Sequence, residues 1–137
     1  AAITSPFTQM DQESEKKALE KLETLKLLKV INVKKAPWSW SRQEKIIGTI
    51  VNNSDKTLKS IKVNASFYDV KGNLIDVKNE WLGSLGFILP KQSVDFSFNR
   101  SLGNQKEPEE TLASRKSASV KINVGDFNIV KTTLEKE

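Results

Sequence analysis

Residues 58–81 constrain the fold most, because apolar and polar side chains alternate there around a turn. The apolar positions before the turn are Ile61, Val63, Ala65 and Phe67. A period of two is typical of a strand with one buried face. Turn residues follow at 69–73, where Gly72 can take the positive φ that a short hairpin loop needs and Asp69 can cap the turn. The stretch therefore predicts a β-hairpin at the centre of the fold.

The second strand of this hairpin is predicted to face inward through Ile75, Val77 and Trp81, with Asp76 on the solvated side. Further strands are predicted at 27–35, 43–52, 93–100, 120–124 and 127–130. Gly125-Asp126 fits a two-residue type II′ turn between the last two. Seven short strands without a βαβ rhythm predict an all-β fold, a seven-stranded antiparallel immunoglobulin-like sandwich. The predicted core comprises Ile50, Val63, Phe67, Val77, Phe96 and Ile122.

Two strands carry more specific expectations. In the first, Leu27, Ile31 and Val33 are predicted to share the inner face. In the second, Gly48 indicates a bulge or a close neighbour. The polar stretch 101–117 is either a mobile loop or holds a short helix that starts after Pro108.

An amphipathic helix is predicted near 11–26, because Ala18, Leu19, Leu22 and Leu25 recur at helical spacing. The chain thus divides into an N-terminal arm and helix (1–26) and a β-sandwich domain (27–137). The leucine stripe is narrow and needs a surface. It either packs on its own domain, with the loop at 81–90 as one such surface, or serves as a stalk or self-association helix.

Composition excludes several classes of site. The 137 residues contain no cysteine and no histidine, which removes thiolate and imidazole metal ligands, cysteine nucleophiles and histidine-based triads. The net charge of +5 is spread along the chain, whereas nucleic-acid binders usually concentrate basic residues on one face. No motif indicates a phosphate loop or a calcium loop. We therefore expect no enzyme activity, no catalytic residue, no cofactor and no metal site.

Two apolar segments are candidates for a partner-binding surface. Trp38 and Trp40 point the same way if their segment is extended, so they either close one end of the core or form an aromatic platform. The connection 81–90 is apolar where connections are usually polar, and its consecutive residues cannot all face inward. The candidate partner-binding residues are Trp38, Trp40, Leu85, Phe87 and Ile88.

Three segments resemble the FxLYD domain family. They are 48–54, similar to its G-x-V-x-N-x-S strand and turn; 67–73, similar to its strand-end YD and following GN turn; and Leu89-Pro90 before Phe96. Two positions depart from the family pattern, since Lys91 stands where glycine is usual and Phe67 replaces an aliphatic residue. The resemblance implies an immunoglobulin-like or fibronectin-like sandwich, found mainly in bacterial exported proteins and lipoproteins, with no common reaction.

These observations leave three hypotheses. The first is a non-catalytic extracytoplasmic module that binds a protein or cell-surface partner, attached to a membrane only through an anchor upstream of Ala1. The second is a structural subunit that oligomerises through its N-terminal helix. The third is binding of nucleic acid or an anionic surface, which the net positive charge and the tryptophans suggest. No small-molecule substrate is evident.

Overall fold

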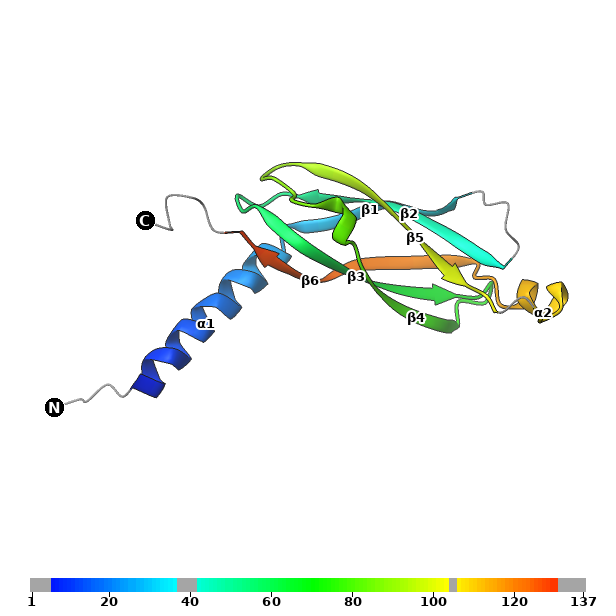
Figure 1. Cartoon of the computed structure of the whole chain (residues 1–137), viewed down its shortest axis with the longest axis horizontal. Coiled ribbons are helices and arrows are strands. Elements are labelled where there is room, and N and C mark those ends of the chain that lie inside the picture. The colour runs from blue at the N-terminus through cyan, green and yellow to red at the C-terminus, as the bar shows by residue number, and fades with distance from the viewer. Residues whose placement is uncertain (1–5, 37–41, 104–105, 131–137) are drawn as a thin grey trace.

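The computed structural model describes residues 6–36, 42–103 and 106–130. Within these ranges the chain forms two α-helices, one 3₁₀ turn and six β-strands (Figure 1). Their bounds are α1 Pro6–Leu25, β1 Leu28–Ala36, β2 Gln43–Asn52, β3 Leu58–Tyr68, β4 Leu74–Trp81, η1 Gly83–Leu85, β5 Ser93–Ser101, α2 Glu109–Ser114 and β6 Ser119–Ile129.

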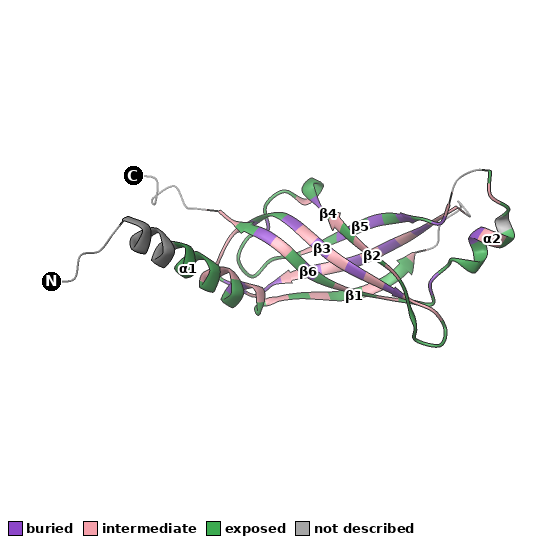
Figure 2. Cartoon of the chain, turned by 90° about the horizontal axis from the view of Figure 1, so that it is seen from below, coloured by how far each residue is buried: buried purple, intermediate pink, exposed green. Residues whose placement is uncertain are grey.

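The strands form two three-stranded antiparallel sheets, ordered β1-β2-β5 and β4-β3-β6. Apolar side chains from both sheets meet in one core, and Figure 2 shows buried positions along β2, β3 and β5. The largest fully buried apolar side chains include Ile46, Ile50, Leu58, Ile61, Phe67, Ile88 and Phe127. The prediction of a mostly β fold with an N-terminal helix is confirmed.

The prediction of seven strands is wrong, because β6 runs without a turn through Gly125 and Asp126. It pairs with β3 on both sides of these residues, where Lys62 lies opposite Asp126 and Val63 opposite Val124. Gly125 is therefore the extra residue of a β-bulge. A Cβ at Gly125 would lie 2.5 Å from the Asn64 amide nitrogen, so the glycine allows that side chain to approach.

The predicted core is correct except at β4. Ile50, Val63, Phe67 and Phe96 are buried, and Ile122 is partly buried against the core. Val77 is 55% exposed, so its assignment to the core is wrong. The cause is the orientation of the whole strand, since β4 places the opposite set of side chains inward.

Strand β1 also departs from its predicted face. Its pairing with β2 shifts between Ile31 and Lys34, and Asn32 between them has a φ of 57°. This bulge puts Leu28, Val30 and Val33 against the core and leaves Leu27 and Ile31 exposed, which corrects the predicted grouping. In β2, the pairing with β5 is continuous, and a Cβ at Gly48 would lie 2.6 Å from the Phe96 ring. Gly48 thus marks a close neighbour.

Helix α1 begins at Pro6, earlier than predicted, and extends away from the sheets (Figure 1). Its C-terminal end is attached to the body through Lys21, whose ammonium lies 2.6 Å from Asp126 on β6, and through Leu25, which packs against the core. The loop after β4 is not covered by the helix, because Phe87 remains 59% exposed. Of the two alternatives left open for 101–117, the short helix after Pro108 is present as α2.

Candidate interaction surface

The reversed orientation of β4 creates an exposed apolar surface. Asp76, Lys78 and Glu80 lie opposite the buried residues Phe67, Ala65 and Val63 of β3, so these charged positions take the inner face. The alternate positions point outward: Ile75 is 40%, Val77 55% and Trp81 58% exposed. We call Ile75, Val77 and Trp81 the outer β4 stripe.

A β-bulge next to the hairpin turn explains this orientation, because Leu74 lies opposite Tyr68 and Asp76 opposite Phe67, which leaves Ile75 as the extra residue. Asp69 accepts hydrogen bonds from the backbone amides of Lys71 and Asn73, at 2.9 and 2.8 Å, and Gly72 has a φ of 85°. The predictions of a capping Asp69 and a positive φ at Gly72 are thus confirmed. Continued from the Tyr68–Leu74 pair without this bulge, the register would place Ile75 opposite Phe67. The bulge shifts the register by one residue, so that Asp76 lies opposite Phe67 and the two faces of β4 are exchanged.

The outer face of the same sheet continues onto β3 and β6 with polar and aromatic groups. The Lys62 ammonium lies 5.4 Å from the Trp81 ring centroid, and the Lys121 ammonium lies 5.4 Å from that of Tyr68. Both distances are within cation–π range. Asn64 of β3 lies between Asn79 and Asn123 on the neighbouring strands. The outer β4 stripe therefore contains the amide of Asn79 and is flanked by further amides and by lysines.

The connection after β4 separates into buried and exposed residues. Ile88 is fully buried and exchanges two backbone hydrogen bonds with Leu58, so it belongs to the core and not to a partner surface. Leu85 is partly buried against the core. Phe87 is 59% and Leu89 53% exposed, so of the three loop residues predicted to bind a partner, Phe87 is the one presented to solvent. Trp38 and Trp40 lie outside the described residues.

A buried asparagine holds this connection in place. The Asn52 amide nitrogen donates to the carbonyl oxygens of Lys56 at 2.8 Å and Leu89 at 3.1 Å. Its side-chain oxygen accepts from the backbone amide of Ser54 at 3.0 Å. Asn52 thereby fastens the turn after β2 to the loop that carries Phe87.

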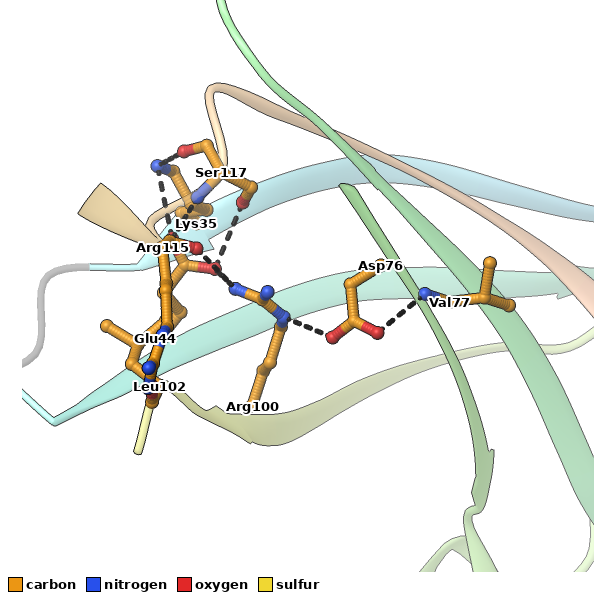
Figure 3. A network of polar contacts seen from close by, with 8 residues as sticks. All are labelled: Lys35, Glu44, Asp76, Val77, Arg100, Leu102, Arg115 and Ser117. Carbon is orange, nitrogen blue, oxygen red and sulfur yellow. Dashed lines mark hydrogen bonds and ion pairs between the residues drawn. The ribbon is translucent and has the colours of Figure 1, made fainter. Parts of the chain in front are cut away.

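The structure also contains a buried polar cluster that joins the two sheets at one end (Figure 3). The Glu44 carboxylate accepts hydrogen bonds from the backbone amide and hydroxyl of Ser117, at 2.6 and 3.0 Å. It also pairs with the Arg100 guanidinium at 3.1 Å, and Lys35 donates to the Ser117 carbonyl. The Arg100 side chain is 9% exposed and lies 4.8 Å from the Phe67 ring.

Arg100, on β5 of one sheet, also contacts β4 of the other sheet. It donates to Asp76 at 2.8 Å and to the Arg115 carbonyl at 3.0 Å. The hydrogen bond from Arg100 holds the pKa of Asp76 below its ordinary value of 3.8. The expectation that Asp76 lies on a solvated outer face is therefore wrong. Every buried side-chain nitrogen and oxygen of the described residues has a partner, which is typical of a structural cluster.

Sequence reasoning missed this cluster, although a signal was present. Glu44 is in phase with the inward-facing Ile46 and Ile50, and Arg100 is in phase with Phe96 and Phe98. A carboxylate and a guanidinium at inward positions of two strands indicate a buried pair, since charged side chains are rarely buried without a partner.

A surface groove of about 520 Å³ is lined by residues that include Lys34, Lys45, Leu85 and Asp95. Asp95 is its one acidic lining residue, and it accepts a hydrogen bond from Thr49 at 2.7 Å. No group of three acidic side chains suited to a metal ion is found among the described residues. Likewise, no helix in the described part is long and apolar enough to cross a membrane.

Comparisons with known proteins show similarity in structure alone. No family model matches the chain, and no curated protein matches it, so the resemblance to the FxLYD family is not confirmed. A DUF1425 family member from Shewanella sp. pv-4 is similar, at 17% identity and a TM-score of 0.45 over 72% of this chain and 77% of that one. The structural genomics target SoR45 is similar at 11% identity and a TM-score of 0.41, over 80% and 89% of the two chains.

Proposed function

We propose that this protein is a non-catalytic binding module that holds a protein partner on the outer β4 stripe. The observation that carries the proposal is the reversed orientation of β4, which presents Ile75, Val77 and Trp81 to solvent. Exposed apolar side chains gathered on one face of a domain tend to mark interfaces, and here Asn79 is the polar residue between Val77 and Trp81. Tryptophan is also enriched among the residues that dominate binding energy, and the polar rim of asparagines and lysines around the stripe fits the same pattern.

The inner side of β4 favours binding through side chains over pairing of a further strand. β4 lies at the edge of its sheet, and edge strands tend to recruit other strands unless they are protected. Asp76, Lys78 and Glu80 point inward along this edge, and such inward charges are a known protection. We therefore place the partner on the outer face.

Site-specific photo-crosslinking in the cells that produce the protein tests the proposal. A crosslinking amino acid at Val77 should give one discrete product, and Trp81→Thr should reduce its yield. The matched control places the same amino acid at Val70, which is 89% exposed in the turn of the same hairpin. Equal products at both positions, or no product at Val77, would refute the proposal.

Single-stranded nucleic acid is a second candidate for the same face. The lysines over Trp81 and Tyr68 are the observation in its favour, because bases stack on aromatic rings and phosphates pair with lysines. Binding of an oligonucleotide that weakens steeply with salt, and that is lost in Trp81→Thr, would support this candidate. Binding unaffected by Trp81→Thr would reject it.

The immunoglobulin-like classification and the extracytoplasmic location are also proposals. Their support is the resemblance to the FxLYD family and one geometric detail at Lys91, the position where that family has glycine. Lys91 has a φ of 63° and follows Pro90 in a turn closed by the Gln92 amide and the Leu89 carbonyl. This is a type II turn, in which glycine is preferred at the position of Lys91. Fractionation of cells that produce the natural full-length protein tests the location.

A further inference from the structure

Helix α1 has two different faces along its C-terminal half. Thr24 is 4% exposed on the face that meets the body, and Lys21 on the same side pairs with Asp126. A second line carries Glu15, Leu19, Leu22 and Lys26, all of them exposed. Their spacing of four, three and four residues places them in one line along the helix. Lys26 continues this line because its backbone amide still bonds to the Leu22 carbonyl, at 3.3 Å.

Against the described residues, both leucines of this line are more than half exposed. Leu19 is 58% and Leu22 56% exposed, and Leu22 lies at the edge of the side that meets the body. Beside this line is a shallow groove of about 260 Å³ between α1 and β6, lined by apolar atoms of Ala18, Leu25 and Phe127 among others. A docked apolar side chain would have room there.

The charges along this line are complementary to those of a second copy of the helix that runs antiparallel. If a second copy lies antiparallel, with a two-fold axis between residues 20 and 21, Glu15 faces Lys26 of the second copy and Leu19 faces its Leu22. On the flank, Lys16 then comes close to Glu23 of the second copy. In a parallel pair the like charges would face each other. A two-fold interface requires a surface that matches itself, and this one does so in the antiparallel orientation alone.

We infer that α1 is a self-association element, and that two copies of this chain dock antiparallel along Glu15, Leu19, Leu22 and Lys26. This inference is independent of the partner proposed for the outer β4 stripe, because the two surfaces share no residue. The contact is small, so the dimer is weak and should appear at concentrations on the order of 100 µM.

Sedimentation equilibrium over a range of concentrations tests the inference with charge reversals. Glu15→Lys and Lys26→Glu should each weaken association about tenfold, since each reversal turns two attractive pairs into repulsive ones. The double variant Glu15→Lys/Lys26→Glu should restore association to within about threefold of the parent, because every pair is again attractive. Leu19→Gln/Leu22→Gln, which keeps helix propensity, should abolish it.

Asp55→Lys is the matched control, because Asp55 is exposed outside the helix and the change in charge equals that of Glu15→Lys. It should leave association unchanged. A parent chain that stays monomeric at millimolar concentration would overturn the inference. A double variant that associates no more strongly than its single variants would also overturn it. The same holds if Asp55→Lys weakens association as much as Glu15→Lys does. Far-UV circular dichroism of each variant verifies that the fold and helix are retained.

Discussion

Replacing Glu44 with leucine should cause one of the largest single losses of stability in this domain. The Glu44 side chain is 4% exposed and accepts two hydrogen bonds from Ser117 in addition to its pairing with Arg100. Leucine has similar bulk but accepts no hydrogen bond. The Ser117 backbone amide, 2.6 Å from the carboxylate, and the buried Arg100 guanidinium therefore lose a partner together.

The magnitude follows from these contacts. Removing one member of a buried ion pair costs about 3–5 kcal/mol, and a buried amide left without an acceptor costs about 1–3 kcal/mol. Arg100 keeps Asp76 and the Arg115 carbonyl as acceptors. The cost of removing its Glu44 partner should therefore lie at the lower end of the range for a buried ion pair. We expect the free energy of unfolding to fall by about 4 kcal/mol. Glu44→Gln retains an oxygen for Ser117, so its loss should be about 2 kcal/mol.

Urea unfolding followed by far-UV circular dichroism measures both losses, and Arg100→Met completes a double-mutant cycle. Glu44→Leu/Arg100→Met should lose about 2 kcal/mol less than the sum of its single variants, because neither charge is then left alone. If Glu44→Leu costs less than about 1 kcal/mol, or the two changes add fully, the cluster does not stabilise the fold as argued.

Three further predictions address the core, the hairpin turn and acid stability. Phe96→Ala should cost about 3–5 kcal/mol in urea unfolding, because Phe96 is 5% exposed, and a loss below about 1 kcal/mol would contradict its burial. Gly72→Val should lower the melting temperature, because Gly72 has a φ of 85° that a β-branched residue tolerates poorly, whereas Lys71→Val should change it little. Arg100 lowers the pKa of Asp76 in the folded state, so this carboxylate contributes stability above about pH 4 that is lost as pH falls through the lowered pKa. Asp76→Asn should therefore make the free energy of unfolding fall less steeply between about pH 4 and pH 2, and an unchanged slope would argue against the Arg100 contact.

The sequence by itself determined the elements whose pattern has one consistent solution. Strands β3 and β5 follow from alternation, and the turn at Asp69 and Gly72 follows from local chemistry, namely a side chain that bonds the nearby backbone and a residue that tolerates positive φ. These features depend on near neighbours in the chain. They could therefore be predicted without knowing the fold.

The tertiary structure alone decided which face of β4 points inward and where β6 ends. Alternation specifies two faces without saying which is buried, and at β4 a bulge at Ile75 placed Asp76 opposite Phe67 against the apolar pattern. Gly125 served as a bulge beside Asn64 and not as a turn, a distinction that depends on the neighbouring strand. Both the outer β4 stripe and the Glu44–Arg100 cluster follow from such pairings between distant strands. The alternation within one strand shows which residues share a face, as Glu44 does with Ile46, but which residues meet across strands depends on the register with the partner strand.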